Sequence, residues 1–84
     1  MNSIEWTAKA LRQARKLPAA DQGRIADAVD TLRDWPDTPL VRALRGKPGY
    51  RLRVGRYRVL FTIQSGIPLI VRIEEVKKRD EHTY

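Results

Sequence analysis

A run of alternating side chains between Tyr50 and Phe61 constrains the fold more than any other part of this sequence. It reads Tyr-Arg-Leu-Arg-Val-Gly-Arg-Tyr-Arg-Val-Leu-Phe, and apolar and basic residues alternate with the period of two that is typical of a half-buried strand. Gly55 and Arg56 interrupt the alternation, and glycine at the first central position suits a two-residue turn of type II′. The run therefore predicts a β-hairpin.

The two-residue turn also sets the register of this hairpin. It pairs Arg53 with Arg58, and the other expected pairs are Val54 with Tyr57, Leu52 with Val59 and Arg51 with Leu60. Three arginines then share one face, although like charges directly opposite each other on a sheet are unfavourable by a few tenths of a kcal/mol or more. We interpret this unfavourable arrangement as a face that binds a polyanion.

A third alternating segment, from Leu69 to Val76, follows a turn signal at Ser65-Gly66-Ile67-Pro68. A two-residue loop would turn Arg72 toward the core, so a three-residue loop over 65–67 is favoured. The expected pairs are then Phe61 with Val71, Val59 with Ile73, Leu60 with Arg72, and Arg58 with Glu74. The prediction is a three-stranded antiparallel meander with a basic outer face, in which Glu74 holds Arg58, followed by a short C-terminal tail.

The first half of the chain predicts one strand and two helices. Residues 3–6 are expected to form an edge strand that pairs with the meander, and Thr7 is expected to cap a helix over 8–16 that ends before Pro18. A second helix starts at Ala19 or Ala20 and runs to about Asp34, where Trp35-Pro36 stops it; its apolar stripe is Ile25, Ala28, Val29 and Leu32. With Trp6 and Trp35 in the core, residues 1–84 are expected to form a single two-layer α+β domain.

The stretch from Asp37 to Gly49 contains Pro39, Pro48 and two glycines, and is expected to be a loop that Leu40 and Leu44 anchor to the core. Its basic residues are Arg42, Arg45 and Lys47. They either extend the basic face or are ordinary solvated loop charges.

The excess of basic over acidic residues is concentrated in the second half of the chain. The net charge is +7; residues 1–35 carry six basic and five acidic side chains, whereas residues 50–84 carry eight and four. Such an excess is typical of a phosphate-binding face or of a docking surface for an acidic partner, and it also occurs as plain solubility charge.

Several classes of protein are excluded or disfavoured. There is no cysteine and one histidine, so cysteine zinc sites and multi-histidine metal sites are excluded, and there is no glycine-rich phosphate loop. No cofactor is expected. No apolar run approaches the roughly 20 residues of a membrane span, so we expect a cytoplasmic protein that makes no membrane contact.

The groups that remain suit metal-free chemistry on an RNA phosphodiester. The 2′-OH of RNA is its own nucleophile, so a protein need only orient it, stabilise the developing charge and move protons. Arginine suits the second task because its planar guanidinium pairs bidentately with phosphate oxygens.

The segment 49–61, the later run Ile-Glu-Glu-Val-Lys-Lys-Arg at 73–79 and the final Tyr84 resemble the RelE/ParE toxins of bacterial toxin–antitoxin modules. The resemblance implies an α/β fold with a central antiparallel sheet and a cognate antitoxin that wraps the toxin. Operator DNA is implied as a ligand only of the toxin–antitoxin complex. The RelE branch implies cleavage of mRNA in the ribosomal A site, and the ParE branch implies inhibition of DNA gyrase without RNA cleavage.

The RelE branch implies a set of site residues. Arg51 and Arg53 match a pair that is lysine in well-known members, Arg58 matches a phosphate-contacting arginine, Arg79 matches one that helps the leaving group, and Tyr84 matches a tyrosine that orients the nucleotide. His82 is a candidate proton donor or acceptor, since its unperturbed pKa lies near neutrality, and its alternative is an exposed tail histidine. The further residues expected to bind RNA phosphates are Arg45, Lys47, Arg56, Lys77 and Lys78.

The favoured prediction is therefore a toxin that acts as a metal-independent, ribosome-dependent mRNA endoribonuclease, with mRNA, the ribosome and an antitoxin as partners. The alternatives are a gyrase inhibitor and a basic nucleic-acid-binding module without catalysis.

Overall fold

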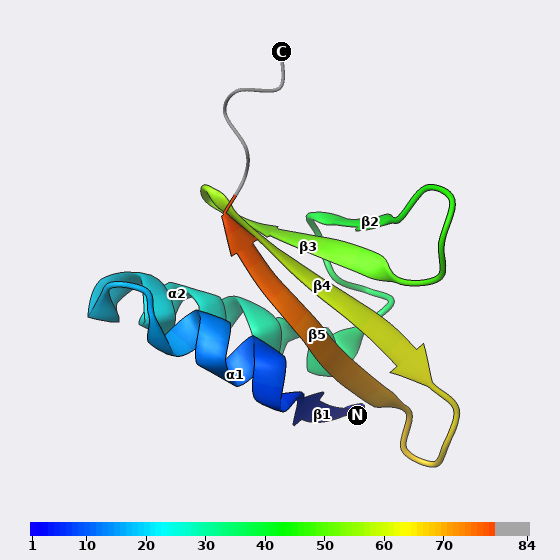
Figure 1. Cartoon of the computed structure of the whole chain (residues 1–84). Coiled ribbons are helices and arrows are strands. Elements are labelled where there is room, and N and C mark those ends of the chain that lie inside the picture. Colours follow the sequence, from blue (N-terminus) through cyan, green and yellow to red (C-terminus); the bar gives the residue numbers. More distant parts are fainter. Residues whose placement is uncertain (79–84) are drawn as a thin grey trace.

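The computed structural model describes residues 1–78 and consists of one sheet with two helices on one of its faces (Figure 1). The elements are β1 (Ser3–Trp6), α1 (Ala8–Arg15), α2 (Ala19–Asp30), the 3₁₀ helix η1 (Thr31–Asp34), β2 (Val41–Ala43), β3 (Tyr50–Val54), β4 (Tyr57–Gln64) and β5 (Ile70–Lys78). The strand order is β1-β5-β4-β3-β2. β1 runs parallel to β5, and the other neighbours are antiparallel. The α+β class, the edge strand and the meander of β3, β4 and β5 are confirmed.

Hydrogen bonds from nearby side chains mark the ends of the helices. The Thr7 hydroxyl oxygen accepts a hydrogen bond from the Ala10 amide at 3.1 Å, which satisfies one of the free N–H groups at the start of α1. The side chain of Gln22 in α2 donates to the Leu17 carbonyl at 2.7 Å and so ties the turn between the helices. The expected second helix divides, because its last turn, Thr31–Asp34, tightens into η1 before Trp35-Pro36 ends it.

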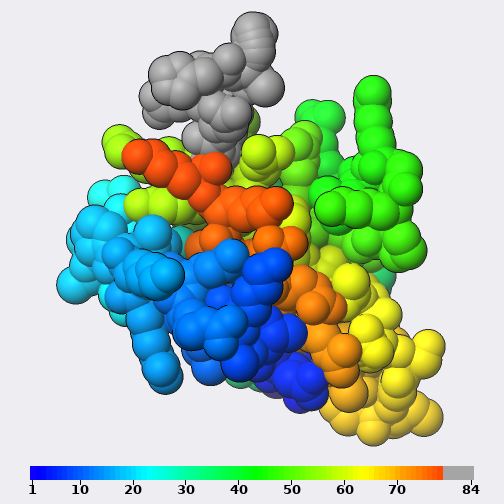
Figure 2. Space-filling view, viewed as in Figure 1, coloured from blue at the N-terminus to red at the C-terminus, as the bar shows by residue number. Residues whose placement is uncertain are grey.

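The core lies between the helices and the sheet. The helices contribute Ala10, Ile25, Val29 and Leu32, and the largest fully buried side chains of the sheet are Phe61, Ile73, Val59 and Val71. Trp6 and Trp35 pack against this cluster as expected. In the space-filling view the helices (blue to cyan) lie against β5 (orange), and the segment around β2 (green) projects at the other edge of the sheet (Figure 2). The helices therefore bury one face of the sheet and leave the other open.

The β3–β4 hairpin has the predicted register in full, from Val54 opposite Tyr57 to Arg51 opposite Leu60. Gly55 has φ +57° and Arg56 has a negative φ, which is the pattern of a type II′ turn.

The predicted register of the third strand was wrong. Phe61 pairs with Ile73 rather than Val71, the connection spans residues 65–69, and a bulge between Leu60 and Phe61 shifts the rest of the ladder, so that Val59 pairs with Val76. Two successive glutamates separate Ile73 from Val76, so an uninterrupted ladder would turn one of these apolar side chains out of the core. Arg58 consequently lies opposite Lys77 and not opposite Glu74, which accepts a hydrogen bond from the Thr62 hydroxyl at 2.8 Å.

The stretch expected to be a loop, residues 37–49, contains the strand β2, which is additional to the four strands that the sequence predicts. β2 pairs with β3 across a connection over residues 44–49, with Arg42 opposite Arg51. Gly49 has φ +116°, and a Cβ there would lie 3.1 Å from the Phe61 carbonyl oxygen, so glycine is required for this turn. Leu40 does not anchor the segment, because it is 65% exposed. No helix among residues 1–78 is long and apolar enough to cross a membrane.

Candidate nucleic-acid interface

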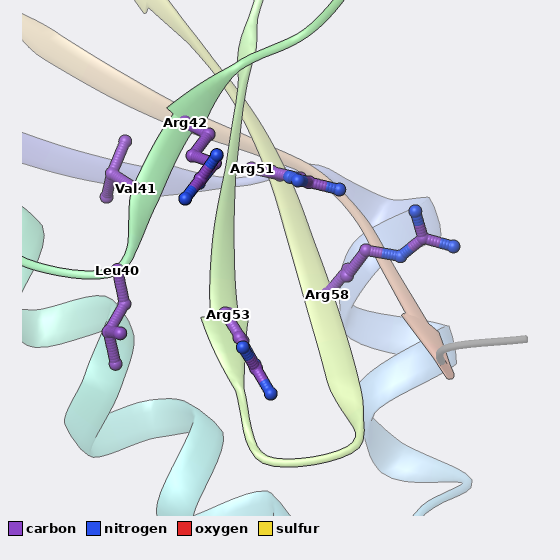
Figure 3. A pocket seen from close by; sticks show the side chains of 6 residues that line it. All are labelled: Leu40, Val41, Arg42, Arg51, Arg53 and Arg58. Carbon is purple, nitrogen blue, oxygen red and sulfur yellow. The ribbon is translucent and has the colours of Figure 1, made fainter. Parts of the chain in front are cut away.

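Four arginines from three adjacent strands meet on the face of the sheet that the helices leave open (Figure 3). We call this set the arginine face: Arg42 on β2, Arg51 and Arg53 on β3, and Arg58 on β4. The strand register places Arg42 opposite Arg51 and Arg53 opposite Arg58. The arginine face therefore contains two like-charge pairs, each of which is unfavourable without a negative ligand.

Two surface hollows lie over the arginine face. The first, of about 520 Å³, is lined by all four arginines with Leu40 and Val41. The second, of about 570 Å³, is lined by Arg42, Arg51 and Arg58 with Ala43, Leu44 and Arg45. No aspartate or glutamate lines either hollow, and within residues 1–78 none of the four arginines forms an ion pair. The surface is therefore cationic, with no acidic partner among residues 1–78.

Arg58 is the member of this face whose polar atoms are most enclosed. Its Nε is buried and has no hydrogen-bond partner among the described residues. A buried donor of this kind costs free energy unless a ligand accepts from it, and a charged guanidinium makes the acceptor preferentially an anion. Arg58 also lines both hollows, so an anion bound there would contact its guanidinium group.

Glu75, a carboxylate on the same face, is already paired with lysines. Glu75 lies opposite Leu60, and its Oε1 is 3.3 Å from Lys9 Nζ and 3.7 Å from Lys77 Nζ. Burial acts to raise the pKa of Glu75, but the hydrogen bond from Lys9 and the charges of Lys77 and Lys47 outweigh it and hold the pKa below its ordinary value. Glu75 thus neutralises lysines at the edge of the sheet, and its ion pairs within residues 1–78 do not include an arginine.

The helix side of the sheet has a different polar contact. The buried Tyr57 hydroxyl donates to Asp21 Oδ2 at 2.7 Å, joining β4 to α2. This hydrogen bond, burial and the charge of Asp21 raise the pKa of Tyr57 above 10.0, against the opposing charges of Arg56 and Arg24. The charge of Arg56 therefore acts on Tyr57, on the helix side of the sheet, and Arg56 lines neither hollow.

The structure brings together some of the predicted site residues and separates others. Arg51, Arg53 and Arg58 share one hollow, and Arg45 lines the other. Lys77 continues the row of Arg53 and Arg58 across the sheet, Lys47 lines a smaller hollow of about 140 Å³ beside Leu60, and Lys78 pairs with the core-facing Tyr57. Arg79, His82 and Tyr84 lie outside the described residues, so their roles stay predictions.

Arg42 is the site residue whose position the sequence did not indicate. It was one of three basic residues in an expected loop, whereas the structure places it on a strand beside Arg51. The signal that could have found it is weak: three strand-compatible residues before a glycine-containing connection to the hairpin. Among residues 1–78 there is no group of three or more metal-ligating side chains.

Comparison with known protein families identifies the family of this chain. Residues 4–80 match the family model described as the ParE toxin of the type II toxin–antitoxin system parDE. No curated protein sequence matches the chain.

Solved structures of two toxin–antitoxin complexes are similar to this fold. The chain is 25% identical to one in the RelBE2 complex of Mycobacterium tuberculosis, covering 92% of this chain and 96% of that one with a TM-score of 0.79. It is 23% identical to one in the archaeal RelE–RelB complex of Pyrococcus horikoshii, covering 95% and 97% with a TM-score of 0.76.

The isolated RelE toxin of Escherichia coli has the same fold at 19% identity, covering 96% of this chain and 87% of that one with a TM-score of 0.79.

Proposed function

Since this chain belongs to the ParE toxin family of type II toxin–antitoxin systems, we propose that it is a toxin that cleaves mRNA in the ribosome without a metal ion. The observation that supports the proposal is the arginine face: four guanidinium groups on the open side of the sheet that have no ion-pair partner within residues 1–78. RNA supplies the phosphates that such a face would bind and the 2′-OH that attacks the scissile phosphate.

The arginines would act by electrostatic stabilisation. Cleavage places extra negative charge on the non-bridging phosphate oxygens, and preorganised donors directed at that charge lower the barrier. Arg58 is best placed for this role because it lies on the central strand β4 and lines both hollows, while Arg51 and Arg53 would hold and orient the phosphate. Arginine keeps its proton in proteins, so these residues would not act as the general base.

Proton transfer would then fall to the residues that follow β5. The strand ends with Lys77 and Lys78 opposite Arg58 and Tyr57, so the last described residues of β5 lie beside the arginine face. We assign His82 to proton transfer, Arg79 to the leaving group and Tyr84 to orientation of the nucleotide.

A cognate antitoxin is the proposed protein partner, as in the RelB–RelE complexes that share this fold. An amphipathic segment of the antitoxin would cover apolar surface such as Leu11, and its acidic residues would neutralise the arginine face. Operator DNA would be bound only by the complex.

Primer extension on an mRNA held in purified 70S ribosomes tests the nuclease. We expect discrete cuts in the A-site codon that are absent from free mRNA. Arg58→Ala should slow cutting about 10²–10³-fold, the usual effect of removing one oxyanion donor. The matched control is Arg12→Ala, which removes the same charge from the exposed face of α1 and should cut at the normal rate. Equal cutting by both variants would remove Arg58 from the mechanism.

Gyrase inhibition is the second candidate, because the matched family model is that of ParE toxins. An intact message on the ribosome together with trapped, cleaved DNA in a gyrase supercoiling assay would establish that candidate in place of the nuclease.

A further inference from the structure

The position of Arg42 on β2 is costly for the free protein. β2 has three residues and is an edge strand, and its central residue lies directly opposite Arg51. Side chains that face each other across an antiparallel pair are about 4.5–5.5 Å apart at Cβ, where like charges repel. The second pair, Arg53 with Arg58, is adjacent on the same face. A short strand therefore carries a repulsion that its few backbone hydrogen bonds must offset.

The described part of the protein does not relieve this repulsion. Arg42 forms no ion pair or side-chain hydrogen bond within residues 1–78, and Leu40 and Val41 beside it offer no charge. On the same face, Glu75 contacts Lys9 and Lys77, and Glu74 accepts from Thr62. No acidic group among residues 1–78 therefore neutralises Arg42.

The shape of the surface indicates more than one negative group. Arg42, Arg51 and Arg58 line both hollows, which extend from these three residues in two directions. One hollow continues to Arg53 and Leu40, and the other to Arg45 and Leu44. A single phosphate would occupy one hollow only, whereas neighbouring phosphates of one strand could occupy both.

We propose that Arg42 binds the phosphate next to the one held by Arg51 and Arg58, so that β2 grips a second phosphate of the same single RNA strand. This inference rests on the proposed RNA substrate. It assigns Arg42 a substrate-binding role, and it explains why a like-charge pair lies at the centre of the pairing of β2 with β3: the bound phosphates neutralise it.

Two opposite effects of Arg42→Ala follow. The variant should bind RNA more weakly, by about tenfold to a hundredfold, the range for loss of a hydrogen bond to a charged group. The free variant should unfold at the same or a higher temperature than the wild type at low salt, because the repulsion from Arg51 is gone. A residue that only supported the strand would lower both stability and affinity.

The assay is fluorescence anisotropy of a labelled, single-stranded oligoribonucleotide of about ten nucleotides with the full chain, at salt from about 50 to about 200 mM. The slope of log K against log salt changes by about 0.7 for each phosphate contact to a single strand. Arg42→Ala should reduce the magnitude of the slope by about 0.7, Arg42→Lys should retain the wild-type slope, and Arg12→Ala should leave slope and affinity unchanged.

The outcomes separate this inference from the proposed nuclease. A slope and affinity for Arg42→Ala equal to those of Arg12→Ala would overturn the role of Arg42, even if the wild type cuts mRNA. If Arg42→Ala weakens only the binding of a duplex DNA probe, the RNA assignment is wrong. The predicted loss for RNA with an uncut message on the ribosome would keep the Arg42 contact and reject the nuclease. Should Arg42→Ala fail to fold, comparison of Arg42→Lys with Arg42→Gln supplies the same test of charge.

Discussion

Two glycine-to-alanine substitutions should change the stability of this protein in opposite directions. Gly49 precedes β3 with φ +116°, and an added Cβ would lie 3.1 Å from the Phe61 carbonyl oxygen and 3.3 Å from Leu44 Cδ1. Gly23 lies inside α2, is exposed, and an added Cβ there has no neighbour within 4 Å. The same methyl group is thus strained at one site and unobstructed at the other.

The magnitudes follow from the backbone. Alanine at 49 must adopt a conformation that favours glycine, at a cost of about 1–3 kcal/mol, and the carbonyl that it meets belongs to the central strand β4 and cannot move away easily. Alanine at 23 gains about 0.4–1 kcal/mol from lower entropy of the unfolded chain and higher helix propensity. For a domain of this size, 1 kcal/mol changes Tm by about 4–8 °C. We expect a loss of at least about 4 °C for Gly49→Ala and a gain of about 2–8 °C for Gly23→Ala.

Thermal unfolding followed by circular dichroism measures both changes under one set of conditions. Gly49→Ala should also increase hydrogen exchange at the Leu44 amide, which donates to the Gly49 carbonyl at 3.0 Å, since the turn that joins β2 to β3 is disturbed. Two variants that shift Tm in the same direction, or a neutral Gly49→Ala, would refute the reasoning from this turn geometry.

Two pH measurements test the electrostatics. Because the pKa of Glu75 is lowered from 4.5, its ion pairs stabilise the fold above that pH, and this stabilisation is lost as the pH falls through the folded-state pKa. The difference in Tm between the wild type and Glu75→Gln should therefore narrow from about pH 6 to about pH 3. A constant difference in Tm would contradict this expectation. Asp21→Asn weakens the hydrogen bond to Asp21 and removes its charge, both of which raise the pKa of Tyr57. Spectrophotometric titration should therefore show this tyrosine ionising at lower pH than in the wild type. An unchanged titration curve would rule out the contact with Asp21.

The parts of the fold that depend on neighbouring residues could be predicted from the sequence. The II′ turn at Gly55-Arg56 sets the pairing of β3 with β4 because only two residues intervene, so Arg53 and Arg58 had to meet on one face. Thr7 before α1 and Pro36 after η1 mark helix ends through contacts within a few residues.

The candidate site residues could likewise be predicted only where they are close to one another in the sequence. Arg51, Arg53 and Arg58 could be grouped from the sequence because they belong to one hairpin, and the structure places them around one hollow. Arg42 could not be grouped with them, since Val-Arg-Ala is too short to indicate a strand, and β2 forms only where β3 offers an unpaired edge.

The sequence by itself determined the arginine hairpin, the helix ends and the resemblance that led to the toxin family. The tertiary structure decided the register of β5 and the fourth arginine. The physical reason is the separation of the partners: β4 meets β5 after five intervening residues and across a bulge, and burial of both Ile73 and Val76 selects that pairing over the regular one. The same packing places Lys77, rather than Glu74, opposite Arg58, and so leaves the arginine face positively charged.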